Sequence, residues 1–478
     1  MPRPPAPAAH VVVLGGGLAG TLAAAALAPH AGGVTVVERD RLPDAPEPRR
    51  GLPQARHAHL FWSGGARAVE ALLPGTHELW ERHGARHIPI PQGMISYSPA
   101  GWFRRWHDER SHHYAIAARR DLTDWVVRTR LTQAFGHVEF RTDRTPVALL
   151  GDSRRVRGLE VRDAGGRPET LEAALVVDAT GRAAVGGRLL AVLGAPPVPV
   201  TRVDAGVAYA SRLYRAPEGA RAGWPVVNIQ ADPTTGEPAG LATVVPTETG
   251  DWLVSLSGTR GRHPTGDVAA FEEFARALRH PLAADLVRRA TPVGAVALTR
   301  STPNIRRHYD RAATPAGFLA VGDAATACNP VYAHGMSSAA RSALALRRVA
   351  DELGVTDERF ARRAQKAVAR EAAAAWTLAT GQDLFFPGVE APAPPGFAAR
   401  AAGRYVTALM NAAIGDHHVV QRFTDVMTLE KPATRLATPR MVLAALRGPR
   451  LPKLDGPALT PDEQAVLDSV RRTDPHPK

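Results

Sequence analysis

The sequence has little cysteine, little lysine and no long hydrophobic run. Its one cysteine, Cys328, excludes an intramolecular disulfide and a cysteine metal cluster, which fits a reducing compartment. No stretch reaches the roughly 18 apolar residues of a membrane span. The N-terminal apolar run stops at Leu14, so it does not form the apolar core of a signal peptide. We therefore expect a cytoplasmic protein without a transmembrane segment.

The scarcity of lysine means that the net charge of +13 comes almost entirely from arginine, since the lysines are only Lys366, Lys431, Lys453 and Lys478. The arginines are scattered without a dense basic tract, which favours a solvated surface over a nucleic-acid patch. We expect no nucleic-acid partner, although the charge can still steer an anionic partner. The arginine-rich stretch 431–453 is interpreted as a solvated helix and turn, with surface docking as the alternative.

The most informative motif is the run VVVLGGGLAGTLAAAALA, which carries Gly15, Gly17 and Gly20 between an apolar run and an alanine-rich stretch. The next apolar run, VTVVERD, ends in Glu38. This is the dinucleotide-binding fingerprint in its strand–turn–helix context. The glycines allow the tight turn, the approach of a pyrophosphate and close helix–strand packing. Glu38 can accept a hydrogen bond from a ribose 2′-hydroxyl, so the expected cofactor is FAD or NAD rather than NADP.

A second motif, GFLAVGDAATACNPVYAHGMSSAARSALAL, predicts a buried strand that ends at Gly322 and Asp323. A loop with Pro330 then leads into a helix that begins near Gly335. The carboxylate can accept a ribityl hydroxyl, because ligands bind at the carboxyl edge of a parallel sheet. The first amides of the helix can face the negative pole of a reduced flavin; they belong to Gly335, Met336 and Ser337.

Together with ALVVDATGRAA, which contains Asp178, these motifs resemble the superfamily of single-component FAD monooxygenases that includes para-hydroxybenzoate hydroxylase and squalene epoxidase. Within it, the chain is most similar to the flavin-dependent epoxidases of polyether antibiotic biosynthesis, such as the monensin and lasalocid epoxidases. The stretches that carry this resemblance are RRGLPQARHAHLFWSGGARAVEALLPG, AARRDLTDWVV, GVAYASRLYRAPEG and RMVLAALRGP. It spans nearly the whole chain and is weakest in 360–430.

The sequence pattern and the resemblance predict an α/β fold. It consists of a Rossmann-type FAD-binding domain, an interleaved antiparallel β-sheet substrate domain and a helical C-terminal region. The expected bounds are 1–83, 119–200 and 300–355 for the discontinuous FAD-binding domain, 84–118 and 201–299 for the substrate domain, and 356–478 for the helical region. Within these, 120–135 and 267–290 are expected to be helical.

The resemblance implies oxygen transfer through a C4a-hydroperoxyflavin. NAD(P)H would reduce the flavin, directly or through a separate flavin reductase, and O₂ would supply the oxygen. The expected reaction is epoxidation of C=C bonds in a hydrophobic polyene, such as a polyketide in antibiotic biosynthesis. Because an alkene needs no deprotonation, no catalytic side chain is expected. The alternatives are aromatic hydroxylation, flavin-dependent reduction of prenyl groups, and a basic RNA- or membrane-associated FAD protein without oxygenase activity.

The resemblance also assigns individual residues to the cofactor. It places Arg56 on the FAD phosphates and Arg120 on the flavin, with Arg119 as the alternative, and it matches Asp323 to the acid on the ribityl chain. The predicted cofactor-binding residues are Gly15, Gly17, Leu18, Ala19, Gly20, Glu38, Arg39, Arg56, Arg120, Asp178, Gly322, Asp323, Pro330, Gly335, Met336 and Ser337.

The substrate cavity is expected to be long and apolar, between the 203–260 block and the flavin, with 84–118 closing it. Its predicted lining residues are Tyr209, Trp224, Asn228 and Gln230. The aromatic residues of this block can equally belong to the core, because alternation alone does not tell which face of a strand is open. No metal site is expected, since His57 and His59 lack a third ligand at suitable spacing.

Overall fold

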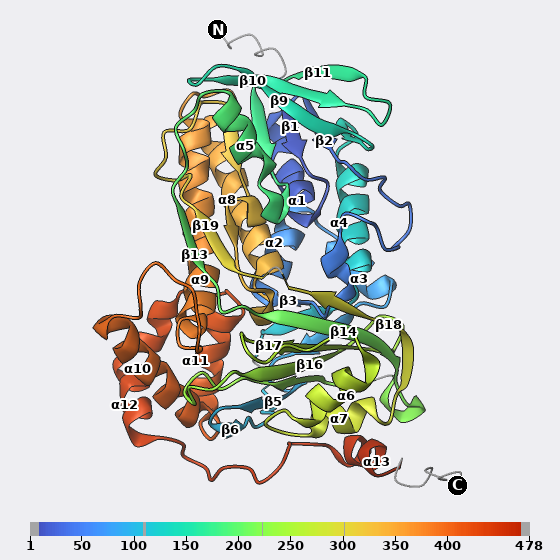
Figure 1. The fold of residues 1–478 in the computed structure, drawn as a ribbon, viewed down its shortest axis with the longest axis vertical. Coiled ribbons are helices and arrows are strands. Elements are labelled where there is room, and N and C mark those ends of the chain that lie inside the picture. Colours follow the sequence, from blue (N-terminus) through green and yellow to red (C-terminus); the bar gives the residue numbers. More distant parts are fainter. Residues whose placement is uncertain (1–8, 109–110, 222, 301, 470–478) are drawn as a thin grey trace.

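The computed structural model describes the chain except for residues 1–8, 109–110, 222, 301 and 470–478. Figure 1 shows two sheet-containing regions, one above the other, with a group of helices beside the lower one. Within the described residues, no helix combines the length and the apolar character needed to cross a lipid bilayer.

The upper region is built on a five-stranded parallel sheet. Its strands in spatial order are β20 (Phe318–Ala320), β12 (Leu175–Asp178), β1 (His10–Leu14), β2 (Gly33–Val37) and β8 (Val138–Arg141). The runs HVVVL and LVVD are almost wholly buried, as expected for parallel strands that are covered on both faces. The strand–helix–strand unit predicted at the N-terminus is confirmed.

Helices cover one face of the parallel sheet and a second sheet covers the other. The helices are α1 (Leu18–Leu27), α4 (Arg120–Ala134), α8 (Gly335–Leu353) and α9 (Phe360–Asp383). The opposite face carries the short helix α5 (Val185–Val192) and an antiparallel sheet of β9 (Thr145–Gly151), β10 (Val156–Arg162) and β11 (Pro168–Glu172). The parallel sheet therefore packs against an apolar core on each of its two faces.

The lower region is built on a seven-stranded sheet. In spatial order its strands are β18 (Thr291–Thr299), β14 (Ala208–Arg215), β17 (Trp252–Gly258), β16 (Gly240–Pro246), β15 (Val226–Ile229), β5 (Met94–Ser98) and β6 (Gly101–Trp102). All neighbours are antiparallel except β15 and β5.

Two helices, α6 (Val268–Arg276) and α7 (Leu282–Val287), pack on the outer face of this sheet. The sequence predicts one helical span over 267–290. The structure divides it before Pro281, because a proline disfavours the helical conformation of the residue that precedes it.

Two small sheets lie between the regions, and two further helices pack in the core of the upper one. The sheet of β3 (Leu60–Trp62), β7 (Tyr114–Ala117) and β4 (Arg86–Pro89) packs on the inner face of the seven-stranded sheet. The sheet of β13 (Val200–Val203), β19 (Asn304–Arg307) and β21 (Thr326–Ala327) runs between the upper and lower regions, as Figure 1 shows. The helices are α2 (Ser63–Leu72) and α3 (Thr76–Arg82).

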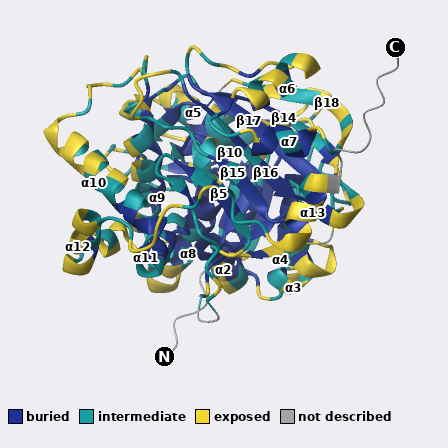
Figure 2. Cartoon of the chain, turned by 90° about the horizontal axis from the view of Figure 1, so that it is seen from below, coloured by how far each residue is buried: buried dark blue, intermediate teal, exposed yellow. Residues whose placement is uncertain are grey.

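The C-terminal part of the chain is helical, with α10 (Phe397–Ala413), α11 (His417–Met427), α12 (Pro439–Arg447) and α13 (Pro461–Ser469). In Figure 2, α10 and α12 carry many exposed residues, whereas the central strands are buried. The predicted α/β architecture, with a Rossmann-type domain, an antiparallel sheet and a helical C-terminal region, is confirmed.

Candidate functional site

A cavity of about 990 Å³ lies between the parallel sheet and the seven-stranded sheet. One end is formed by the loops that follow β1, β2, β12 and β20, which is the carboxyl edge where open α/β sheets bind ligands. The other end is formed by the inner face of the seven-stranded sheet and by α10 and α11. A single space therefore joins the predicted cofactor loops to the predicted substrate sheet.

Most of the predicted cofactor residues line this cavity. They are Gly15, Gly17, Leu18, Ala19, Glu38, Arg39, Arg120, Gly322, Asp323, Pro330, Gly335 and Met336. The structure does not bring Gly20, Arg56, Asp178 or Ser337 to its wall.

The glycine loop after β1 forms an open cradle. Gly15 has a φ of +98°, and a Cβ at Gly20 would lie 1.8 Å from the Gly15 carbonyl oxygen, so both positions require glycine for the turn itself. Gly17 differs, because a Cβ there would meet only the Arg49 guanidinium, at 3.7 Å. The space above Gly17 is therefore open to a ligand.

The carboxylate of Glu38 is buried beside this cradle. Its Oε2 accepts a hydrogen bond from Gly16 N at 2.8 Å, and its Oε1 accepts one from Asp40 N at 3.0 Å. Arg49 Nη1 lies 3.0 Å from Oε2. Burial raises the pKa of Glu38, but the charge of Arg49 and these hydrogen bonds outweigh it, so the pKa lies below its ordinary value. The acid is thus ionised and ready to accept from a hydroxyl.

Arg49 was not identified from the sequence, which indicated Arg56 instead. Arg56 is exposed, whereas the Arg49 side chain is 8% exposed and lines the cavity. The loop folds back at Gly51, where a Cβ would lie 1.8 Å from Asp40 Oδ2, and this brings Arg49 to Glu38. No local pattern distinguishes Arg49 from its neighbours in PEPRRGLPQAR.

Asp178 is the last residue of β12 and has a structural role. It is fully buried and accepts hydrogen bonds from Thr180 N at 3.0 Å, Thr180 Oγ1 at 2.6 Å and Gly186 N at 2.8 Å. Burial raises its pKa. The carboxylate therefore shapes the turn below the cavity and does not face it. Ser337 is likewise turned inward, since its Oγ accepts from Trp62 N at 3.1 Å.

The loop after β20 supplies a second wall. Gly322 has a φ of +56°, and the neighbouring Asp323 side chain is 39% exposed within the cavity wall. Arg182 Nε lies 3.7 Å from Asp323 Oδ2, and the same guanidinium donates to the carbonyls of Pro303 and Cys328 at 2.7 and 2.6 Å. At the start of α8, nothing lies within 4 Å of a Cβ at Gly335, so the first amides of that helix border open space.

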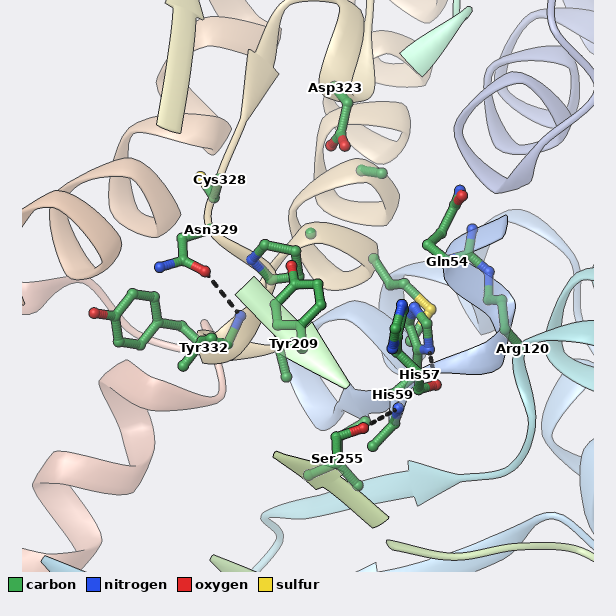
Figure 3. A pocket seen from close by; sticks show the side chains of 18 of the residues that line it. Gln54, His57, His59, Arg120, Tyr209, Ser255, Asp323, Cys328, Asn329 and Tyr332 are labelled. Carbon is green, nitrogen blue, oxygen red and sulfur yellow. Dashed lines mark hydrogen bonds between the residues drawn. The ribbon is translucent and has the colours of Figure 1, made fainter. Parts of the chain in front are cut away.

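Figure 3 shows how side chains surround the space, with Asp323 above, Tyr209 centrally, Gln54, His57, His59 and Arg120 on one side, and Asn329 and Tyr332 on the other. Arg120 is buried and its Nε donates to Asp124 Oδ1 at 2.5 Å. Arg119, the alternative, instead binds Glu248 outside the cavity, at 2.5 Å. The structure thus places Arg120, and not Arg119, in the wall.

Three of the four predicted substrate residues line the cavity: Tyr209, Asn228 and Gln230. Trp224 does not. It packs in the core of the lower region, 5.1 Å from the Trp252 ring. Strand β15 begins only at Val226, so the alternation of inward and outward side chains does not extend back to Trp224.

His57 sits between two strands of the seven-stranded sheet. Its Nδ1 lies 2.8 Å from Ser211 Oγ and its Nε2 lies 2.8 Å from Thr299 Oγ1. Burial, followed by the charge of Arg56, lowers the pKa of His57 to about 4. Burial, followed by the charge of Arg120, lowers the pKa of His59 to about 3. Both histidines are therefore neutral at physiological pH and add no charge to the cavity.

The neutral state of His57 predicts that the protein loses stability in mild acid. In the unfolded chain the imidazole takes up a proton near pH 6.5, whereas the folded chain resists it until about pH 4, so acidification over this window favours unfolding. His57→Asn should reduce the loss of unfolding free energy between pH 7.5 and pH 5 by about 2 kcal/mol. Urea titrations at both pH values measure this. The same change at the exposed His83 is the control, and an equal pH dependence in wild type and His57→Asn would contradict the prediction.

One group of three possible metal ligands occurs within the described residues, and none of the three lines this cavity. Atoms of His112, His113 and Asp425 lie within 4.8 Å of one another. Asp425 already pairs with Arg422 at 2.9 Å and with His113 at 3.0 Å, and His112 pairs with Glu430 at 2.9 Å. These pairs join the segment before β7 to α11 and the turn after it.

Comparison with known proteins agrees with the fold. No protein-family model matches the chain. Protein Rv3254 of Mycobacterium tuberculosis is 30% identical over 352 residues, which cover 72% of this chain and 73% of that protein. A solved triple mutant of the flavin-dependent brominase Bmp2 has a TM-score of 0.64 at 13% identity, over 91% of this chain and 98% of that one. The p-nitrophenol 4-monooxygenase PnpA from Pseudomonas putida has a TM-score of 0.59 at 18% identity, over 88% and 97%.

Proposed function

Since the chain belongs to the family of protein Rv3254 of Mycobacterium tuberculosis and shares the fold of two flavin enzymes, we propose that it is an FAD-dependent monooxygenase. Its proposed reaction is the epoxidation of C=C bonds in a hydrophobic polyene, such as a polyketide. The observation that carries the proposal is the single cavity, which joins a glycine cradle beside an ionised acid to an uncharged sheet face.

The residues at the cradle fit FAD. The open space at Gly17 suits a pyrophosphate, and Glu38 suits a ribose hydroxyl, with Arg49 beside it to balance phosphate charge. Asp323 and the first amides of α8 suit the ribityl chain and the ring. FAD bound there would supply oxygen-transfer chemistry, with O₂ as the oxygen source and electrons from NAD(P)H, either directly or through a separate flavin reductase.

The side chains facing the seven-stranded sheet would bind the substrate and exclude water. Trp62 and Ile90 pack with Val226 and Val245 in one apolar cluster, which forms part of the wall together with Phe103. His57 and His59 lie in the wall and are uncharged. Because oxygen transfer to an alkene removes no proton from the substrate, a sheet whose own lining residues include no charged side chain and no histidine suits this reaction.

Aromatic hydroxylation is the second candidate, and one feature favours it. A hydrogen-bonded chain runs from Thr299 through His57 to Ser211, and Ser211 Oγ lies 2.5 Å from Ser255 Oγ. Thr299 and Ser255 both line the cavity. Such a chain can move a phenolic proton along hydroxyl and imidazole groups.

One experiment distinguishes polyene epoxidation from aromatic hydroxylation. Protein loaded with FAD is supplied with NADPH, with and without a flavin reductase, and offered either a linear polyene or a small phenol. We expect O₂ consumption coupled to a polyene product that gains one oxygen atom, with a rate that a metal chelator does not change. A rate that rises with phenol ionisation, without polyene turnover, would replace epoxidation by hydroxylation. Activity lost to a chelator and restored by iron would contradict the flavin mechanism.

A further inference from the structure

The inner face of the seven-stranded sheet carries a row of neutral polar side chains. We call Ser96, Asn228, Thr243 and Ser255 the polar row; they stand on β5, β15, β16 and β17 and all line the cavity. The strand registers pair Ser96 with Asn228, Asn228 with Thr243, and Thr243 with Ser255. Neighbouring strands lie about 4.8 Å apart, so the row crosses the sheet over roughly 14 Å.

The lining residues on the two sides of the polar row differ in polarity. On one side the cavity is lined by Met94, Val226 and Val245, which are apolar. On the other side Leu241 is in register with Ser257, and Ser257 with Tyr209. A ligand lying across the strands therefore meets hydrocarbon along one edge and hydrogen-bonding groups along its middle and its other edge.

Several of these polar groups are free to bind a ligand. In the described part of the chain, the side chains of Ser96, Asn228, Thr243 and Ser257 form no hydrogen bond with protein. The Tyr209 hydroxyl is buried without any partner, and the residue is 5% exposed. Buried polar groups are normally paired, so an unpaired hydroxyl at a cavity wall points to a partner that the protein itself does not supply.

The charged residues of the cavity wall all lie outside the seven-stranded sheet. The charged lining residues are Glu38, Arg39, Arg49, Arg50, Arg120, Arg182, Arg188, Asp323 and Asp383. None belongs to the seven-stranded sheet. A carboxylate or phenolate lying on the polar row would be desolvated without a cationic side chain on the strands that carry the row, which is unfavourable. Neutral oxygens can use the free groups without that penalty.

We infer that the substrate is a long uncharged chain that carries hydroxyl or carbonyl oxygens along an otherwise hydrocarbon skeleton, and that the polar row with Tyr209 selects it. This inference rests on the proposed function in taking the sheet end of the cavity as the substrate site. The inference differs from the expectation of a purely apolar cavity, because the polar row lies among apolar lining residues.

Calorimetric titration of the FAD-loaded protein tests this with three probes that share one carbon chain: ricinoleyl alcohol with two hydroxyls, oleyl alcohol with one, and oleate with a carboxylate. One additional neutral hydrogen bond corresponds to roughly fivefold in affinity. We expect ricinoleyl alcohol to bind roughly fivefold more tightly than oleyl alcohol, and oleate to bind most weakly. Equal affinity for the two alcohols, or a preference for oleate, would overturn the inference.

Two variants locate the effect in the polar row. Asn228→Leu and Thr243→Val keep the approximate volume and remove the hydrogen-bonding groups, so at least one of the two variants should bring the affinity for ricinoleyl alcohol down to that for oleyl alcohol. Thr170→Val makes the same change on the exposed face of β11 and should keep the preference. A preference that persists in both row variants would also overturn the inference.

These titrations measure binding and need no turnover. The proposed reaction and the inference about the polar row can therefore be refuted independently. If the diol preference depends on the polar row but no probe or polyene is oxygenated, the proposed reaction is wrong and the recognition of neutral oxygens stands. If polyenes are epoxidised while the two alcohols bind equally well, the reaction stands and the inference about the polar row is wrong.

Discussion

The Gly17→Val protein is expected to fold normally and to be purified without FAD. Gly17 has a φ of −77°, which valine adopts readily, and an added Cβ would meet only Arg49 Nη2, at 3.7 Å. The branched side chain therefore fits the folded chain but occupies the cradle that a pyrophosphate needs. We expect FAD affinity to fall by at least about 100-fold, which corresponds to roughly 2.7 kcal/mol.

Three measurements check this outcome together. Visible absorbance reports bound flavin, circular dichroism reports the fold, and added FAD should raise the Tm of the wild-type protein but not that of Gly17→Val, because a ligand stabilises only a protein that binds it. Gly136→Val is the matched control, since a Cβ at this exposed turn meets nothing within 4 Å. A well-folded Gly17→Val protein that retained stoichiometric FAD would refute the cofactor assignment.

Asp323→Ala provides an intermediate case at the same site. It removes one carboxylate from the wall and adds no bulk, so FAD affinity should fall by about 1–3 kcal/mol, the range for a lost charged hydrogen bond. The order wild type, Asp323→Ala, Gly17→Val in FAD affinity therefore distinguishes loss of a contact from steric exclusion.

The cofactor loops could be predicted from the sequence because their determinants are local. An apolar run, glycines at fixed offsets and a following helix specify the turn at Gly15 whatever the rest of the chain does. Arg49 could not be found in this way, since its position depends on how the loop after β2 folds back on Asp40. Asp178 follows a buried strand as expected, but hydrogen bonds to Thr180 and Gly186 turn it away from the cavity.

The substrate end was less predictable because it depends on long-range pairing. Alternation indicated Tyr209 and Asn228 but failed at Trp224, which precedes the strand. The polar row has no sequence signature at all, because its four members come from strands that are brought into register only by the folded sheet.

Asp383 shows the same limit for the helical region, where no pattern in the sequence indicated a polar centre. This carboxylate, 1% exposed at the last residue of α9, borders the cavity. It accepts hydrogen bonds from Asn304 Nδ2 at 2.7 Å, Asn329 Nδ2 at 3.0 Å and Tyr332 Oη at 2.6 Å. Burial raises the pKa of Asp383, and these neutral donors act against that effect. The residue therefore fastens α9 to β19 and to the loop that leads into α8.

Asp383→Ala is accordingly expected to lower the free energy of unfolding by about 3–5 kcal/mol, because it leaves three buried donors without their acceptor. For a chain of 478 residues the corresponding fall in Tm is roughly 3–5 °C. FAD affinity should weaken as well, since the loop that carries Pro330 and leads to Gly335 loses its attachment. Asp383→Asn should have a smaller effect, about 1–2 kcal/mol, because its amide oxygen still accepts and the Tyr332 hydroxyl can rotate to accept from its NH₂ group.

Thermal unfolding and FAD titration of both variants measure these effects, with Asp468→Ala as the control. Asp468 is an exposed helical aspartate that accepts from Gln464 at 3.1 Å, so its loss should change stability by no more than about 0.5 kcal/mol. If Asp383→Ala were as stable as Asp468→Ala, the three hydrogen bonds would not hold the loop. If instead Asp383→Asn lost as much stability as Asp383→Ala, the negative charge itself, rather than the acceptor oxygens, would be what the surrounding donors require.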